Sequence, residues 1–261
     1  MNLRRTAIAM LAAAWLPLTP LRAAEPAKPI RLILVGDSTM ASKSGYGDAL
    51  CARLKPEAVC INLARGGRSS GSFRAEGLWD RVQALLRESG SAYSQTLVLI
   101  QFGHNDQPGK PGRSTDLATE FPANMARYVA EVKALGGLPV LVTPLTRRTF
   151  RERVLQNDLQ AWAEVSRQVA ASAQVPLLDL NALSYAAVQA MGEAEADTLA
   201  MAPPVGDEPR LPASSAERAG AANPKFDRTH LGDKGARLFS QIVATELIRL
   251  LPGLAGQFRP D

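Results

Sequence analysis

The chain has 261 residues, of which 46% are hydrophobic and 21% charged, and it is long enough to bury one sizeable core in a single domain. Its formal charge is +5, which falls to +2 if Arg4, Arg5 and Arg22 are removed with an N-terminal export signal. Such a small surplus is no evidence for a nucleic-acid partner. No run of Lys and Arg alternates with aromatic residues either, so we expect no nucleic-acid groove.

The first 24 residues have the three parts of an export signal. Arg4 and Arg5 form a basic head, residues 7–18 are apolar, and small residues stand at positions 23 and 24. The alternative is an uncleaved anchor, but the apolar run is short for a bilayer and no later segment has 18 uninterrupted apolar residues. We therefore expect a signal peptide over 1–24 and a single domain over 25–261, exported to the periplasm or secreted, with no membrane partner.

Five short apolar runs rich in Val, Ile and Leu have the length of strands buried on both faces. They occupy residues 30–35, 58–63, 96–102, 138–143 and 175–180. Apolar residues at spacings of three and four predict helices over 78–86, 121–135, 159–169 and 233–251. Strands alternating with helices predict a parallel sheet covered by helices on both faces. Residues 193–225, with several Pro, Gly and Ser, are predicted to form a surface loop or an irregular insertion.

Cys51 and Cys60 are the only cysteines. An even count in a chain predicted to be exported favours a disulfide. The alternative is two buried thiols, one on a helix and one on a strand, because sequence spacing does not fix the geometry of a disulfide. With only two cysteines and two histidines, a zinc site is not expected.

The first predicted strand leads directly into Gly-Asp-Ser-Thr-Met-Ala over residues 36–41, which places Ser38 at the carboxyl end of a strand. Functional residues of parallel sheets collect at this edge, so Ser38 is a candidate nucleophile. The alternative is that Ser38 caps a following helix.

His230 distinguishes these two readings of Ser38. It stands in Asp-Arg-Thr-His-Leu over residues 227–231, just before the last predicted helix. A serine hydroxyl needs a base, and imidazole titrates in the right range. Asp227, three residues earlier, is suited to hold the imidazole in its productive tautomer. We therefore predict catalytic roles for Ser38, Asp227 and His230.

Two further blocks follow strands. Gln-Phe-Gly-His-Asn-Asp over residues 101–106 contains His104 and Asn105, whose side-chain amide is suited to bind a developing oxyanion. Asn-Leu-Ala-Arg-Gly-Gly-Arg-Ser over residues 62–69 contains Gly66 and Gly67, where a backbone N–H can approach the same oxygen. Ordinary turn chemistry is the alternative for both blocks.

Together these four blocks resemble the SGNH hydrolase superfamily, and three of them look like its rhamnogalacturonan acetylesterase branch. The resemblance spans residues 30–251. It implies a three-layer α/β/α, flavodoxin-like fold with a parallel five-stranded sheet. It also implies an oxyanion hole formed by the Ser38 N–H, the Gly67 N–H and the Asn105 side chain, with His104 a structural or substrate-binding histidine.

The resemblance further implies a serine esterase that removes O-acetyl groups from a polysaccharide such as rhamnogalacturonan through an acyl-enzyme, with no cofactor. Arg68 is expected to contact the substrate. Four arginines in loops are candidates for binding uronate carboxylates, namely Arg65, Arg68, Arg147 and Arg148. A lysophospholipase or thioesterase on the same fold, and a carbohydrate-binding protein without turnover, are the alternatives.

A competing motif is Gly-Arg-Ser-Ser-Gly over residues 67–71, which fits the Gly-x-Ser-x-Gly nucleophile elbow and would make Ser69 the nucleophile. An elbow opens directly into a helix, whereas Gly71 and Gly77 here flank a loop. We therefore expect residues 68–70 to line the cleft instead.

Overall fold

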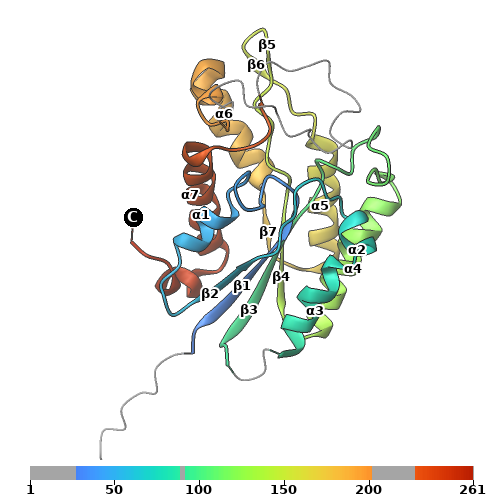
Figure 1. The fold of residues 1–261 in the computed structure, drawn as a ribbon, viewed down its shortest axis with the longest axis vertical. Helices are drawn as coiled ribbons and strands as arrows, with labels where there is room; N and C mark the ends of the chain where they lie inside the picture. The colour runs from blue at the N-terminus through green and yellow to red at the C-terminus, as the bar shows by residue number, and fades with distance from the viewer. Residues whose placement is uncertain (1–27, 89–91, 202–226, 261) are drawn as a thin grey trace, which may run out of the picture.

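The computed structural model describes residues 28–88, 92–201 and 227–260. Its centre is a parallel sheet of five strands in the order β2-β1-β3-β4-β7 (Figure 1). The strands are β1 (Ile30–Gly36), β2 (Val59–Asn62), β3 (Gln95–Gln101), β4 (Leu138–Val142) and β7 (Leu177–Leu178). Because the strands are parallel, the loops that follow them gather at one edge of the sheet.

Helices cover both faces of the sheet, which confirms the predicted three-layer α/β/α fold. On one face, Leu32 and Leu34 of β1 pack with buried residues of α1 (Gly47–Ala52), α6 (Leu180–Asp197) and α7 (Asp233–Leu250). On the other face, Ile33 and Val35 pack with buried residues from the remaining helices, α2 (Ser72–Ala75), α3 (Leu78–Glu88), α4 (Glu120–Ala134) and α5 (Gln160–Ala173). Figure 1 shows the two groups on opposite sides of the strands.

The five predicted strands and four predicted helices are all present, with small shifts at their ends. The last strand is shorter than expected because Pro176 has no N–H to donate and Asp179 caps the next helix, α6, by accepting from the Ala182 N–H. Among the described residues, sequence periodicity missed the short helices α1 and α2, the long helix α6, the antiparallel pair β5 (Phe150–Arg151) and β6 (Val154–Leu155), and the final 3-10 helix η1 (Pro252–Gln257).

The predicted loop over 193–225 is wrong at its start. Residues 193–197 form the end of α6, beyond an interruption at Gly192, whose φ of +75° suits glycine. Ala200 then forms an isolated antiparallel bridge with Leu231, next to the last predicted motif. Residues 202–226 and the predicted signal peptide lie outside the described part of the chain.

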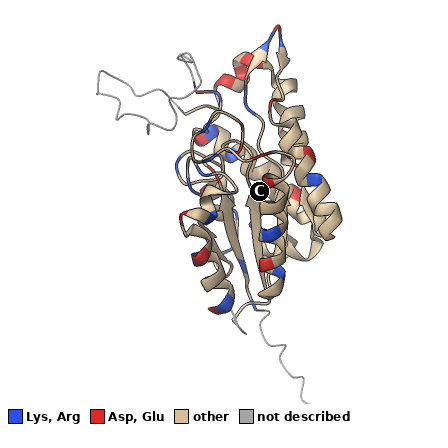
Figure 2. Ribbon diagram, turned by 90° about the vertical axis from the view of Figure 1, so that its right-hand side faces the viewer, with Lys and Arg blue, Asp and Glu red and all other residues tan. Residues whose placement is uncertain are grey.

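In the described ranges, no helix is both long and apolar enough to cross a membrane. Figure 2 shows acidic and basic residues interspersed along the outer helices, while the central strands carry few charged residues. This distribution accords with the small net charge and with a sheet buried on both faces.

Cys51 on α1 and Cys60 on β2 form a disulfide, with 5.4 Å between their Cα atoms. We expect replacement of both cysteines by serine to lower the free energy of unfolding by about 2–3 kcal/mol, because the open chain gains entropy in the unfolded state. Urea denaturation with and without dithiothreitol measures this effect. The reductant should destabilise only the wild type, and equal wild-type and variant midpoints under oxidising conditions would contradict the prediction.

Candidate active site

The turn after β1 presents Ser38 at the carboxyl edge of the sheet. Asp37 shapes this turn: its Oδ1 accepts hydrogen bonds from the Thr39 N–H at 2.9 Å and the Thr39 hydroxyl at 2.8 Å. No helix starts directly after Ser38, since α1 begins at Gly47, so Ser38 is not a helix cap. Its side chain is available for other chemistry.

Ser38, His230 and Asp227 lie together as predicted from the sequence. His230 Nε2 is 2.9 Å from Ser38 Oγ, and His230 Nδ1 is 2.7 Å from Asp227 Oδ2. Asp227 Oδ1 also accepts from the backbone N–H groups of Thr229 and His230, at 2.8 and 2.9 Å. This is the geometry in which a carboxylate orients an imidazole and the imidazole withdraws a proton from a serine hydroxyl.

The electrostatics of Asp227 suit this role. Burial alone would raise its pKa, but the hydrogen bonds and charge of His230, together with the two backbone donors, hold the pKa well below its usual range. Asp227 therefore stays anionic over the working range of an esterase, and its charge favours the protonated imidazole that forms during proton transfer.

Ser44 joins the two halves of the site, and sequence reasoning missed it. Its hydroxyl donates to the Ser38 carbonyl at 2.8 Å, and its own carbonyl accepts from the Leu231 N–H at 2.9 Å. The turn that carries the serine is thereby tied directly to the segment that carries the histidine.

The predicted oxyanion donors lie around the turn after β2. Gly67 adopts a φ of +76°, and a Cβ built on Gly66 would lie 3.7 Å from Ser38 Cβ, so this turn adjoins the serine. Asn105 Nδ2 donates to the Arg68 carbonyl at 3.1 Å, which fixes the amide beside the same turn. Within the described ranges, the backbone N–H groups of Ser38 and Gly67 donate to no protein acceptor. These groups are therefore available to a substrate oxygen.

Asp106 braces the turn from inside the protein. Its fully buried carboxylate accepts from the Ser70 N–H at 3.0 Å, the Ser70 hydroxyl at 2.6 Å and the Thr115 hydroxyl at 2.9 Å. Burial raises the pKa of Asp106 to about 6, against the opposing effect of these hydrogen bonds. The structure thus links the turn to the segment at Thr115 through a carboxyl group that sequence patterns did not single out.

A pH dependence of stability follows from Asp106. Because its pKa is raised on folding, its favourable contribution is complete below pH 4 and is lost as the pH rises through about 6. An Asp106→Asn change keeps an acceptor without the charge, so its stability relative to the wild type should improve between pH 4.5 and 7.5 by on the order of 1–3 kcal/mol. Urea denaturation at the two pH values measures this difference, and a relative stability that falls with pH would contradict the assignment.

His104 is placed inside the protein rather than on a surface open to substrate. Its side chain is 3% exposed, and its Nδ1 lies 3.3 Å from Asp37 Oδ2. Burial lowers the pKa of His104, while His104 and the Thr39 donors outweigh burial and lower the pKa of Asp37. A neutral imidazole beside an anionic Asp37 accounts for this pair, so the geometry supports the structural role of His104 over the substrate-binding role.

A chain of buried hydrogen bonds leads from Asp37 deeper into the sheet. Thr39 Oγ1 accepts from Gln101 Nε2 at 2.7 Å, and Gln101 Oε1 accepts from the Tyr46 hydroxyl at 2.7 Å. Tyr46 and Gln101 are both fully buried. The serine turn therefore rests on buried hydrogen bonds through Thr39, Gln101 and Tyr46 that hold its backbone in place.

Ser69 does not have the surroundings of a nucleophile. It is fully buried, and its hydroxyl interacts with the Ser72 hydroxyl at 3.2 Å and accepts from the Ser72 N–H at 3.1 Å. These contacts organise the start of α2, which is a structural role. The expectation that residues 68–70 line the cleft is met only in part, because Ser69 and Ser70 are both buried.

Arg68 lies at the surface of the same turn. Its guanidinium donates to Glu76 Oε2 at 2.9 and 2.8 Å and to the Gly66 carbonyl at 2.8 Å, and its side chain is about one-third exposed. Two other cations approach Asn105 itself: Lys110 Nζ lies 3.4 Å and an Arg113 nitrogen 3.5 Å from Asn105 Oδ1. Two positively charged side chains thus lie beside the candidate oxyanion donor.

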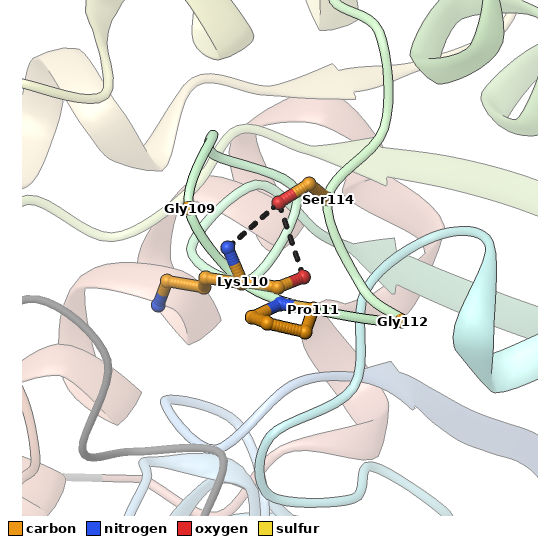
Figure 3. Close-up of a pocket in the computed structure, with 5 residues that line it drawn as sticks. All are labelled: Gly109, Lys110, Pro111, Gly112 and Ser114. Carbon is orange, nitrogen blue, oxygen red and sulfur yellow. Dashed lines mark hydrogen bonds between the residues drawn. The ribbon is translucent and has the colours of Figure 1, made fainter.

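An open pocket of about 330 Å³ adjoins Lys110 (Figure 3). It is lined by Gly109, Lys110, Pro111, Gly112 and Ser114. The Ser114 hydroxyl accepts from the Lys110 N–H at 2.9 Å, and Figure 3 shows it above the turn while the Lys110 side chain extends away. A second hollow of about 560 Å³ shares Gly112 and Ser114 and continues toward α2 and α4. In the described part of the chain, no cluster of His, Cys, Asp or Glu is arranged to hold a metal ion.

A doubly covered parallel sheet with serine, histidine and aspartate at its carboxyl edge defines the class of protein: a hydrolase of the SGNH fold. The model of the GDSL-like Lipase/Acylhydrolase family matches residues 34–238. The chain therefore belongs to this family, as the motifs predicted.

Two similar proteins come from Bacillus subtilis (strain 168). The probable rhamnogalacturonan acetylesterase YesY is 33% identical over 220 residues, covering 82% of this chain and 90% of the relative. The rhamnogalacturonan acetylesterase RhgT is 31% identical over 226 residues, covering 83% and 89%. The predicted resemblance to this branch is confirmed.

Solved structures agree on the fold. The protein YXIM of Bacillus subtilis aligns with a TM-score of 0.65 at 25% identity over 89% of this chain, which spans only 59% of that longer protein. A catalytic mutant of Axe2, an acetylxylan esterase from Geobacillus stearothermophilus, aligns with a TM-score of 0.55 at 17% identity over 86% of this chain and 94% of Axe2. At that identity the likeness concerns the fold alone.

Proposed function

We propose that this protein is a serine esterase that removes O-acetyl groups from an acidic, rhamnogalacturonan-like polysaccharide. The observation that carries the proposal is the 2.9 Å contact between Ser38 Oγ and His230 Nε2, with Asp227 on the far side of the ring. The two acetylesterase relatives, each aligned over more than four-fifths of this chain, support a carbohydrate ester as substrate.

The proposed reaction has two steps. In the first, Ser38 Oγ attacks the acetyl carbonyl carbon while His230 Nε2 takes its proton, and the developing oxyanion is bound by the Ser38 N–H, the Gly67 N–H and Asn105 Nδ2. The tetrahedral intermediate then expels the sugar alcohol, which receives the proton from His230. In the second step, His230 takes a proton from water as the water oxygen attacks the acetyl-enzyme. The new tetrahedral intermediate expels Ser38 Oγ, which receives the proton from His230, and the acetic acid that leaves ionises to acetate in solvent.

Positively charged side chains beside the site support an acidic substrate. Lys110 and Arg113 approach Asn105, and the Arg68 side chain lies at the surface of the adjoining turn, paired with Glu76. Cations at these positions suit the carboxylates of neighbouring uronate residues. The open pocket beside Lys110 offers room for a sugar ring. A neutral acetylated xylan has no carboxylates on its backbone, so we expect a lower kcat/KM with it.

Acetate release from acetylated rhamnogalacturonan and acetylated xylan, followed at low and high salt, tests the proposal. We expect faster release from the acidic polymer and an advantage that shrinks as salt screens the cations. Mass spectrometry of acid-quenched protein should show one acetyl group on Ser38. Preferential cleavage of long-chain acyl esters, or sugar binding without acetate release, would contradict the proposal.

We further propose that residues 1–24 are an export signal and that the mature domain starts at residue 25. The disulfide between Cys51 and Cys60 supports an oxidising destination. N-terminal sequencing of protein recovered from the periplasm and the medium of an expressing bacterium tests both points. An intact N-terminus in a cytoplasmic fraction would contradict them.

A further inference from the structure

Arg148 is a fully buried arginine in the segment between β4 and β5. Its guanidinium donates to the Asp227 carbonyl at 3.1 Å, the Thr229 carbonyl at 3.3 Å and the His230 carbonyl at 2.7 Å. Its backbone N–H donates to the Arg228 carbonyl at 2.9 Å. One residue therefore binds all four consecutive carbonyls of the segment that carries the catalytic aspartate and histidine.

The burial of this cation is costly, and no described carboxylate forms a direct ion pair with it. Burial lowers the pKa of Arg148 to about 10, against the opposing charges of Asp227 and Asp197 and together with that of Arg228. Arg148 thus remains charged at neutral pH. Its position corrects the expectation that it contacts uronates, because a fully buried side chain cannot reach a polymer.

Other contacts hold the same segment at its outer side. The Arg228 side chain pairs with Asp197 at 3.0 Å and Glu193 at 2.7 Å, both on α6. These pairs involve carboxylates and do not touch the backbone of Asp227 or His230. Among the described side chains, Arg148 is the one whose donors bind the carbonyls of both catalytic residues.

We propose that Arg148 is a positioning residue that holds the catalytic pair Asp227 and His230 in place. By binding the four carbonyls it fixes the segment so that His230 Nε2 stays within reach of Ser38 Oγ. Its positive charge also disfavours a second nearby cation, so it opposes protonation of His230 before the serine is attacked. In the described chain, the charges that act on its pKa are those of Asp227, Asp197 and Arg228. The inference rests on the proposed acyl transfer at Ser38.

Two substitutions separate geometry from charge. Arg148→Lys keeps the positive charge but loses the planar guanidinium group with its several donors. A displacement of the catalytic groups by about 1 Å lowers the reaction rate by up to about 100-fold. We expect kcat on p-nitrophenyl acetate to fall about 10-fold, with KM and the acid limb of the pH profile unchanged. Arg148→Met removes the charge as well, so we expect a loss nearer 100-fold and an acid limb shifted to higher pH.

Arg31→Met is the matched control. Arg31 is also a buried arginine that donates to a backbone carbonyl, that of Leu85 at 2.6 Å, but it lies near the amino end of β1, away from the site. This change should lower the melting temperature while leaving kcat and the acid limb unaltered. A merely structural role of Arg148 would make its variants behave like this control.

The outcomes distinguish the inference from the proposed function. Arg148 variants that fold and keep wild-type kcat and pH profile would overturn the positioning role, even if Ser38→Ala is inactive. If Arg148→Met does not fold, the lysine variant decides. Failure of both to fold would reduce Arg148 to a structural residue and also overturn the inference. An active Ser38→Ala protein would instead overturn the proposed function.

Discussion

Ser38→Ala should lower kcat for ester hydrolysis by about 10⁴- to 10⁶-fold, the scale seen when a triad nucleophile is removed. The reason is that His230 would face a methyl group and no acyl-enzyme could form at this position. The remaining turnover would come from direct attack of water on the ester, with the oxyanion donors still stabilising the intermediate. Acetate release and the mass of the quenched protein measure the two effects together.

Ser69→Ala is the matched control because it removes the hydroxyl of the competing Gly-x-Ser-x-Gly motif. Ser69 is buried against Ser72, so its loss should reduce stability while kcat stays within several-fold of the wild type. A variant pair in which only Ser69→Ala loses the acetyl-enzyme would identify the other serine as the nucleophile. Circular dichroism and melting curves establish that both proteins are folded.

Asp227→Asn should lower kcat by about 10³- to 10⁴-fold, although the two side chains have nearly the same shape. The Thr229 and His230 N–H groups both donate to Asp227 Oδ1, so an amide would keep its oxygen there. Its NH₂ group would then face His230 Nδ1 and donate to it. The ring would carry its proton on Nε2 and could no longer accept one from Ser38.

Asp233→Asn is the control for this change, since Asp233 is an exposed carboxylate in the first turn of α7. We expect its kcat within about twofold of the wild type, in line with exposed sites away from specific contacts. Steady-state kinetics across the pH range compares the two variants. Retention of most of the activity in Asp227→Asn would show that the carboxylate does not set the tautomer.

The layers of the fold were predictable because the strands are mainly Val, Ile and Leu and stand out as short apolar runs between helical patterns. The ends of the strands were less predictable. Pro176 has no N–H to donate and Asp179 caps the next helix, so the last strand is short, and hydrophobic periodicity does not show either effect. The helix α6 was missed because its buried positions are few and are separated by alanines and polar residues.

Ser38, Asp227 and His230 were predictable because each lies within a recognisable motif at an expected place in the chain. Arg148, Asp106 and Ser44 were not, because their partners are backbone groups or hydroxyls far away in sequence. Sequence spacing carries no record of such contacts. For His104 the motif was evident, but the sequence left a structural and a substrate-binding role open. Its burial beside Asp37 supports the structural role.

The serine and the histidine that it contacts are 192 residues apart, and the Ser44 bridge joins the same two distant segments. During synthesis, Ser38 leaves the ribosome long before His230, so its hydroxyl at first has no base to activate it. Under the proposed acyl transfer, hydrolysis therefore begins only when residues 227–231 dock on the turn after β1, so turnover would report complete folding. Local opening of residues 227–231 would then abolish activity while most of the sheet remained intact.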